Sequence, residues 1–197
     1  MGAIFLSASV PLLGRSPFDQ DCEPQMIQSA VSALATVAFG RKTIVWGGHP
    51  SITPMLWASA NDLGVEYATA VSLFQSKFFS EEDFPQENKN FANVTYIDDV
   101  EGDLKKSLWA MREAMFKSTD FDAAVFIGGM EGVNDEYSLF HALQPKAKCI
   151  PIAVTGGAAR MLAVKLNYVL PVDLSPLDFI GLLYRELAIS PIDPRTV

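Results

Sequence analysis

Short apolar segments alternate with helix-length segments along the whole chain, and this alternation limits the possible folds more than any other feature. Residues 123–127 read Ala-Ala-Val-Phe-Ile, without a polar position. A strand of this kind is buried on both faces, which is typical of parallel sheets. Parallel strands are joined by crossover helices, so the alternation predicts repeated strand–helix units. Six strands are expected, at residues 4–8, 43–46, 69–74, 94–97, 123–127 and 150–154.

The segments between these strands have the spacing and capping residues of helices. Apolar residues recur at helical spacing over residues 104–117. Thr53 is expected to cap a helix over residues 54–63, with Pro54 at its first position. Further helices are expected at residues 24–39, 133–143, 158–166 and 178–188. The predicted fold class is α/β, a three-layer Rossmann-like fold with a mainly parallel sheet flanked by helices.

The chain length of 197 residues corresponds to one domain. An apolar share of 49% and a charged share of 19% exclude a disordered chain, because such a composition can bury a core. We expect a single domain over residues 1–189 and an irregular C-terminal arm over residues 190–197. Residues 75–93 are polar and acidic and are expected to form the longest loop. Pro151 indicates the start of a strand or a strand at the sheet edge.

Charge and cysteine content exclude several functional classes. The net charge is −8, from 23 acidic and 15 basic residues, which argues against general nucleic-acid binding, since that needs a basic face. Cys22 and Cys149 form no CxxC motif, so neither a disulfide framework nor a zinc site is expected. The sequence contains no apolar run of the length, about 18 residues, that a membrane helix needs, and no secretory signal is expected. A cytoplasmic protein without a membrane partner, metal or cofactor is therefore predicted.

Paired glycines follow three of the expected strands. In a parallel α/β sheet, ligands bind beyond the carboxyl ends of the strands, near the switch in strand order. A helix follows each glycine pair, and the N–H groups at a helix start favour an anion such as phosphate. Three pairs at one edge favour a ligand site over a purely structural role for the glycines. The pairs are Gly47-Gly48, Gly128-Gly129 and Gly156-Gly157.

The middle pair belongs to the most specific motif, which reads Gly-Gly-Met-Glu-Gly-Val-Asn-Asp-Glu over residues 128–136. It resembles the Pro-Gly-Gly-x-Gly-Thr-x-x-Glu motif of the Lonely Guy family, which are cytokinin-activating phosphoribohydrolases. Ile127 replaces the family's proline, one residue is inserted before Gly132, and Val133 replaces its threonine. Glu136 falls on the family's glutamate. The similarity implies a nucleotide site at this loop.

The similarity in pattern covers residues 43–157. Arg112 falls at the place of an arginine that the family carries in the helix before the motif. The chain is best described as resembling the wider SLOG superfamily, which joins Lonely Guy proteins with the Smf/DprA proteins. Residues 154–159 look like loops of SLOG domains from bacterial defence systems, whose members sense nucleotide-derived signals. The resemblance thus implies a nucleotide-binding Rossmannoid domain.

The resemblance makes Glu136 and Arg112 the candidate catalytic residues. Glu136 would stabilise an oxocarbenium-like transition state or activate water, and Arg112 would bind phosphate or orient Glu136. Each has a plain alternative, because a glutamate near a helix start is favoured by the helix dipole and an arginine can simply be a solvated helix residue. The candidate ligand-binding residues are Ser7, Ser9, Arg15, Gly47, Gly48, His49, Gly128, Gly129, Gly132, Val133, Thr155, Gly156 and Gly157.

Three functions stay open at the level of sequence, so the sequence does not decide whether the chain is an enzyme. The first is sensor-like binding of a nucleotide-derived small molecule, of cyclic or ADP-ribose type, in a bacterial defence system with an unidentified effector partner. The second is an N-glycosidase or phosphoribohydrolase that releases the base from a nucleoside monophosphate. The third is a non-catalytic oligomeric scaffold. A homo-oligomer is expected in each case, through apolar helices such as residues 104–117.

Overall fold

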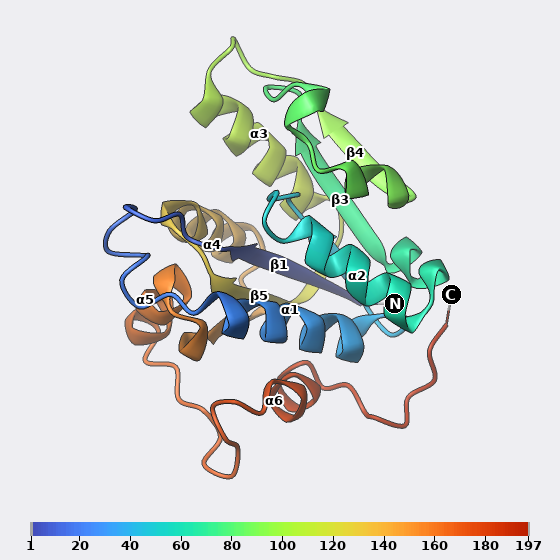
Figure 1. Ribbon diagram of the computed structural model, residues 1–197, viewed down its shortest axis with the longest axis vertical. Helices are drawn as coiled ribbons and strands as arrows, with labels where there is room; N and C mark the ends of the chain where they lie inside the picture. The colour runs from blue at the N-terminus through green and yellow to red at the C-terminus, as the bar shows by residue number, and fades with distance from the viewer. Residues whose placement is uncertain (1, 197) are drawn as a thin grey trace.

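The computed structural model describes residues 2–196 (Figure 1). A six-stranded sheet runs through these residues in the order β4-β3-β2-β1-β5-β6, and every neighbouring pair is parallel. This confirms the predicted α/β class. The strands are β1 (Ala3–Ser9), β2 (Thr43–Trp46), β3 (Val71–Ser76), β4 (Asn93–Ile97), β5 (Phe121–Gly128) and β6 (Lys148–Ile152).

Helices cover both faces of the sheet, giving the three layers that the sequence predicts. One face packs on α1 (Pro24–Ala38), α2 (Thr53–Leu63) and α6 (Phe179–Glu186). The other face packs on α3 (Leu104–Lys117), α4 (Glu131–Leu143) and α5 (Gly157–Lys165). Short 3-10 helices are η1 (Val65–Ala70), η2 (Glu81–Asp83), η3 (Gln86–Asn90) and η4 (Ala153–Thr155).

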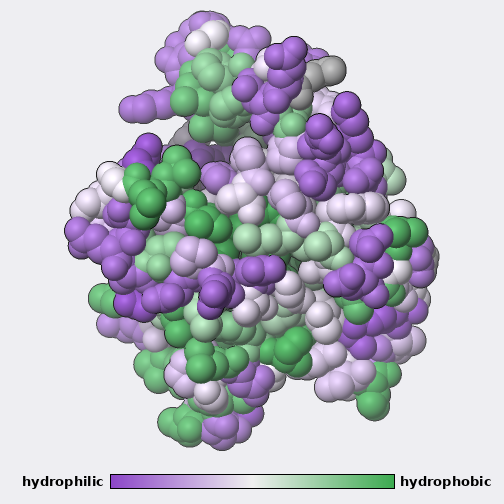
Figure 2. All heavy atoms as spheres, viewed as in Figure 1, coloured by the Kyte–Doolittle hydropathy of each residue, from purple (hydrophilic) through white to green (hydrophobic). Residues whose placement is uncertain are grey.

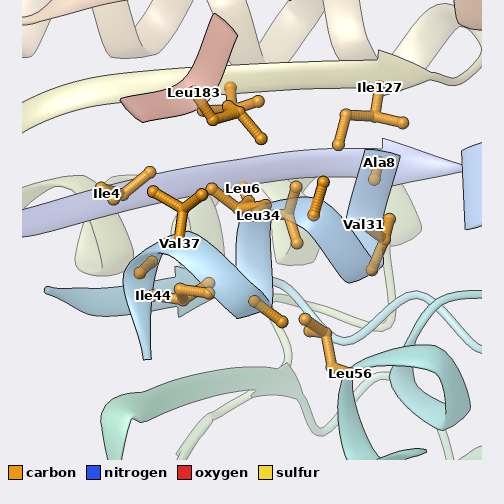
Figure 3. Packing of buried hydrophobic residues seen from close by; sticks show 14 of the residues in the cluster. Ile4, Leu6, Ala8, Val31, Leu34, Val37, Ile44, Leu56, Ile127 and Leu183 are labelled. Carbon is orange, nitrogen blue, oxygen red and sulfur yellow. The ribbon is translucent and has the colours of Figure 1, made fainter. Parts of the chain in front are cut away.

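Strand β1 lies at the centre and divides the core into two parts. Its side chains alternate, so Ile4 and Leu6 enter the core with α1 while Phe5 enters the core on the opposite face. Figure 3 shows Ile4 and Leu6 packed against side chains of α1, including Leu34. On the other face, the ring of Phe5 stacks on that of Phe140, with ring centroids 5.4 Å apart.

The topology places a crevice beside β1. The chain proceeds outward from β1 to β4 and then returns to place β5 on the other side of β1. The helices that follow β1 and β5 therefore leave on opposite faces of the sheet, α1 on one and α4 on the other. Such a switch point leaves an opening at the carboxyl edge of the sheet, which is where ligands of α/β folds bind.

Several predicted boundaries are wrong for identifiable reasons. The third strand begins at Val71, because residues 65–70 form a 3-10 helix. The expected loop over residues 75–93 holds the end of β3 and two 3-10 helices. Thr53 does not cap α2, since its hydroxyl donates to the His49 carbonyl and accepts from the Trp46 indole. Pro151 lies in the edge strand β6, as its missing N–H requires.

The predicted C-terminal arm packs against the end of α1. The Arg195 guanidinium donates to the Phe39 carbonyl, and the Thr196 N–H donates to the Gly40 carbonyl at 2.7 Å. Residue 197 lies outside the described residues.

On the face drawn in Figure 2, hydrophilic and hydrophobic side chains intermingle. Over residues 2–196, the structure contains no helix with the length and apolar character to cross a membrane.

We expect Phe140→Ala to lower the free energy of unfolding by about 3–5 kcal/mol, as for other large core aromatics. Phe140 is fully buried and contacts the rings of Phe5, Phe116 and Phe121. Urea unfolding measures the change. Leu13→Ala is the control, because Leu13 is 96% exposed and its loss should change stability by about 0.5 kcal/mol at most. Equal effects of the two substitutions would contradict this description of the core.

Candidate functional site

A cavity of about 510 Å³ opens at the carboxyl edge of the sheet. Its walls come from the ends of β1, β2 and β3, from α3, from the first turns of α4 and from Phe79, Asp83 and Phe84. It therefore coincides with the switch point of the topology. The predicted site residues that line it are Ser7, Ser9, Arg15, Gly47, Gly48, His49, Arg112, Gly132, Val133 and Glu136.

The structure brings Ser7, Arg112 and Glu136 together from three elements. The Ser7 hydroxyl at the end of β1 donates to Glu136 Oε2 at 2.6 Å. Arg112 of α3 donates from Nε to Glu136 Oε1 at 3.3 Å, and its Nη1 lies 3.5 Å from Asp135 Oδ2. Only 10% of the Arg112 side chain is exposed. Both oxygens of the Glu136 carboxylate are thus engaged by the protein itself.

The surroundings of Glu136 shift the pKa of its carboxyl in opposite directions. Burial raises the pKa of the Glu136 carboxyl above its ordinary value, because a buried carboxylate loses hydration. The Arg112 guanidinium and the Ser7 hydroxyl oppose this rise by stabilising the ionised form. The net effect is a raised pKa, which is a feature of carboxyls in functional sites.

The loop after β2 forms the next part of the wall. Gly48 has a left-handed backbone with φ of 73°, and a Cβ there would lie 1.8 Å from Gln75 Nε2. The Gln75 amide donates to the Gly48 carbonyl at 3.3 Å, so a glycine is required for this close approach. His49 Nδ1 accepts from the Ser51 N–H at 3.3 Å. Burial lowers the pKa of His49, which favours a neutral imidazole.

Two of the three helix starts behind glycine pairs offer few N–H groups to a ligand, contrary to the expectation from sequence. At α2, the N–H groups of Ile52 and Thr53 both donate to the His49 carbonyl, and Pro54 has none. At α5, the Gly157 N–H donates to Asp21 Oδ1 at 3.0 Å. These donors are already satisfied by the chain.

The third glycine pair and its surroundings lie outside the cavity. Thr155 is fully buried, where its hydroxyl accepts from the Gly128 N–H at 2.8 Å and donates to the Ile152 carbonyl. A Cβ on Gly156 would lie 2.0 Å from the Asp21 carbonyl. These contacts hold loops together. The predicted site residues that do not line the cavity are Gly128, Gly129, Thr155, Gly156 and Gly157.

The loop between β1 and α1 reaches the mouth of the cavity. Arg15 of this loop pairs with Glu131, the first residue of α4, with Nη2 2.9 Å from Oε2. Both side chains are more than half exposed. Arg15, which the sequence offers as a ligand-binding residue, lines the cavity, and the structure gives it an acidic partner that the sequence did not reveal.

Sequence reasoning missed the apolar wall of the cavity. Leu108 and Met111 precede Arg112 on the same face of α3 and line the cavity, although helical spacing alone marks them as core. Residues 79–84 contribute two phenylalanines and Asp83 from the segment expected to be a loop. The sequence did contain one sign of this wall. Arg112 shares its helix face with the apolar Leu108 and Met111, and a charged side chain on an otherwise apolar face indicates that the face borders a polar space.

Among residues 2–196, no cluster of three or more His, Cys, Asp or Glu side chains could hold a metal ion.

Residues 17–187 match the SLOG cluster3 family. The chain belongs to this family. The match begins after β1, so Ser7 and Ser9 lie outside it, while Arg112 and Glu136 lie inside it. The resemblance to the SLOG superfamily in the sequence is thereby confirmed.

The SLOG fold of this chain also resembles a solved structure. The X-ray structure of TM1055, a structural-genomics target, matches it with a TM-score of 0.54 and 14% identity. The match covers 83% of this chain and 81% of TM1055. At this level of identity the likeness supports the Rossmann-like fold alone. The curated proteins give no match.

We expect the stability of Glu136→Gln relative to the natural chain to increase as the pH rises from about 4.5 toward 7. The folded pKa of Glu136 is raised above 4.5, so the folded state holds its proton more tightly than the unfolded state does. Ionisation of Glu136 therefore lowers the free energy of unfolding of the natural chain as the pH rises from the unfolded to the folded pKa. A glutamine does not ionise, so the variant does not lose this stability. Urea unfolding of both proteins across this pH range measures the difference.

The exposed substitution Glu82→Gln is the control for the loss of one charge. Groups shared by the natural chain and the variant cancel in the comparison. A difference for Glu136→Gln that stays constant or decreases with pH would contradict the raised pKa.

Proposed function

We propose that this chain binds a nucleotide-derived small molecule in the cavity beside β1 and acts as a sensor-like protein. The observation that carries the proposal is the position of a polar cluster, Ser7, Arg112 and Glu136, at the switch point of a parallel sheet. Membership of the SLOG family supports a nucleotide-related function. The ligand is of cyclic or ADP-ribose type, and the biological setting is a bacterial defence system with an effector partner.

The cavity combines the two surfaces that a nucleoside needs. Leu108, Met111 and the rings of Phe79 and Phe84 form an apolar wall on which a base can stack. The buried hydroxyl of Ser9 and the carboxylate of Glu136 provide a polar end for ribose hydroxyls. A mostly apolar pocket with few convergent polar groups is typical of small-molecule sites.

A homo-oligomer that pairs through α3 is part of this proposal, since Leu104 and Trp109 are exposed there.

An N-glycosidase is the second candidate, and Glu136 is the observation that favours it. In such a reaction the bond between the anomeric carbon and the base breaks, water adds to that carbon, and the base takes up a proton. A carboxylate beside the sugar would stabilise the positive charge that develops. In this cavity, however, the Arg112 guanidinium forms an ion pair with Glu136, with Nε 3.3 Å from Oε1. A carboxylate that is already paired with an arginine attracts a second positive charge less strongly. This pairing favours binding over catalysis.

We expect at least one member of a nucleotide panel that includes cyclic nucleotides and ADP-ribose to raise the melting temperature. A ligand at about 100 times its Kd stabilises the folded state by about 2.7 kcal/mol, which is several degrees. Phe84→Ser should reduce the shift, because Phe84 lines the cavity. Val172→Ser is the control on a fully exposed side chain. A folded protein that no member of the panel stabilises would refute nucleotide binding.

We expect no release of free base from nucleosides, nucleotides or ADP-ribose, since Arg112 engages Glu136. Chromatography of overnight reactions measures the base. If base is released, an enzymatic function requires that Glu136→Gln lower the rate by about 100-fold or more, while Glu101→Gln, on an exposed glutamate outside the cavity lining, leaves it unchanged. If the natural chain releases base and Glu136→Gln largely abolishes this release, the chain is an N-glycosidase and the sensor proposal is wrong. Release that Glu136→Gln does not affect would come from a contaminating enzyme.

A further inference from the structure

Both arginines that line the cavity are already paired with carboxylates of the chain, and the charged side chains of the lining are five in all. They are Arg15, Asp83, Arg112, Glu131 and Glu136. Three carboxylates face two guanidinium groups, so the formal charge of the lining is −1 with His49 neutral. Arg15 pairs with Glu131 at 2.9 Å, and Arg112 pairs with Glu136 at 3.3 Å. Among the described residues of the lining, no cation is left for a ligand without a competing carboxylate.

The start of α4 is the helix terminus that borders the cavity, and it also carries a carboxylate of the chain. Glu131 is the first residue of α4, where the positive end of the helix dipole favours a negative charge. Its carboxylate lines the cavity. A hydrogen bond from its own backbone N–H and the Arg15 guanidinium lower its pKa, so Glu131 is ionised at neutral pH. A fixed negative charge therefore stands where an anionic ligand group would meet the helix.

The helix starts behind the other two glycine pairs, those of α2 and α5, offer few free N–H groups in place of α4. Their N–H groups donate to the His49 carbonyl and to Asp21. Asp21 in turn pairs with Arg160, with Oδ2 2.8 Å from Nη1. A doubly charged phosphate that entered the cavity would thus have to displace a carboxylate from its arginine.

We propose that Glu131 is a specificity-determining residue that excludes ligands with a terminal phosphate monoester and admits nucleosides and phosphodiesters. This inference rests on the proposed nucleotide binding and names the class of ligand. A phosphate monoester carries a charge of about −1.5 to −2 at neutral pH, and repulsion between like charges grows with that charge. A cyclic mononucleotide carries one negative charge and nucleosides carry none. ADP-ribose carries two charges, but they are spread over two phosphate groups, so no single group has the charge of a monoester.

A purely structural role of Glu131 predicts a different change in ligand binding. If the carboxylate only stabilises the start of α4, its removal lowers the melting temperature and weakens the binding of all ligands alike. As a specificity residue, its removal tightens the binding of monophosphates selectively, because Arg15 is released at the same time. The two roles are therefore separated by comparing ligands of different charge on the same variant.

Isothermal titration calorimetry with adenosine, cyclic AMP, ADP-ribose and AMP, and with the corresponding guanine compounds, tests the proposal. The natural chain should bind its best nucleoside or diester about tenfold or more tightly than the monophosphate of the same base. Glu131→Gln should reduce this ratio to about twofold by tightening monophosphate binding. Arg15→Gln should increase the ratio, since Glu131 then keeps its charge without a partner.

Glu101→Gln is the matched control. It removes the same charge from an exposed glutamate that pairs with Lys106, far in sequence from the cavity lining of α4, and should leave the ratio unchanged. A natural chain that binds monophosphates as tightly as nucleosides, or a Glu131→Gln variant with an unchanged ratio, overturns the inference while nucleotide binding stands. If neither protein binds any of these compounds although circular dichroism shows both folded, nucleotide binding fails and the inference falls with it.

Discussion

Strand β1 is buried on both faces and paired on both edges, and the position of the other elements depends on it. Its seven residues are all buried, with β2 on one edge and β5 on the other. Because the helices that follow β1 and β5 leave on opposite faces of the sheet, an opening remains at its carboxyl edge, where the cavity lies. Ser7 lies near the carboxyl end of this strand and lines the cavity. The same constraint that orders the sheet therefore fixes one member of the polar cluster.

The starts of α4 and α5 already have charged partners within the chain, although the glycine-rich loops suggest helix starts that are free for a ligand. Asp21 satisfies the start of α5, and Glu131 carries a charge at the start of α4. Each carboxylate has an arginine partner, Arg160 and Arg15 respectively. A buried or half-buried charge costs free energy unless it is paired, and this chain meets the requirement internally. Under the proposed function, recognition would rest mainly on shape, stacking and hydroxyl groups, with little direct attraction of phosphate.

The glycine pairs show how similar sequence signals can have different structural causes. Gly48 lines the cavity and allows the backbone to approach Gln75. Gly156 allows a close approach to the Asp21 backbone, outside the cavity. Both have a positive φ, so a glycine is needed at each. Sequence cannot distinguish a glycine in a cavity wall from one that lets another loop approach, because the backbone conformation required is the same.

The sequence by itself determined the α/β class and the order of strands and helices along the chain, while the family resemblance implied only that Arg112 binds phosphate or orients Glu136. Local periodicity and the apolar strand over residues 123–127 suffice for the first two. Only the tertiary structure decided that Asp21 fills the start of α5 and that Glu131 meets Arg15, because these partners lie 136 and 116 residues apart. Contacts over such distances depend on how the layers pack, and no local pattern encodes them.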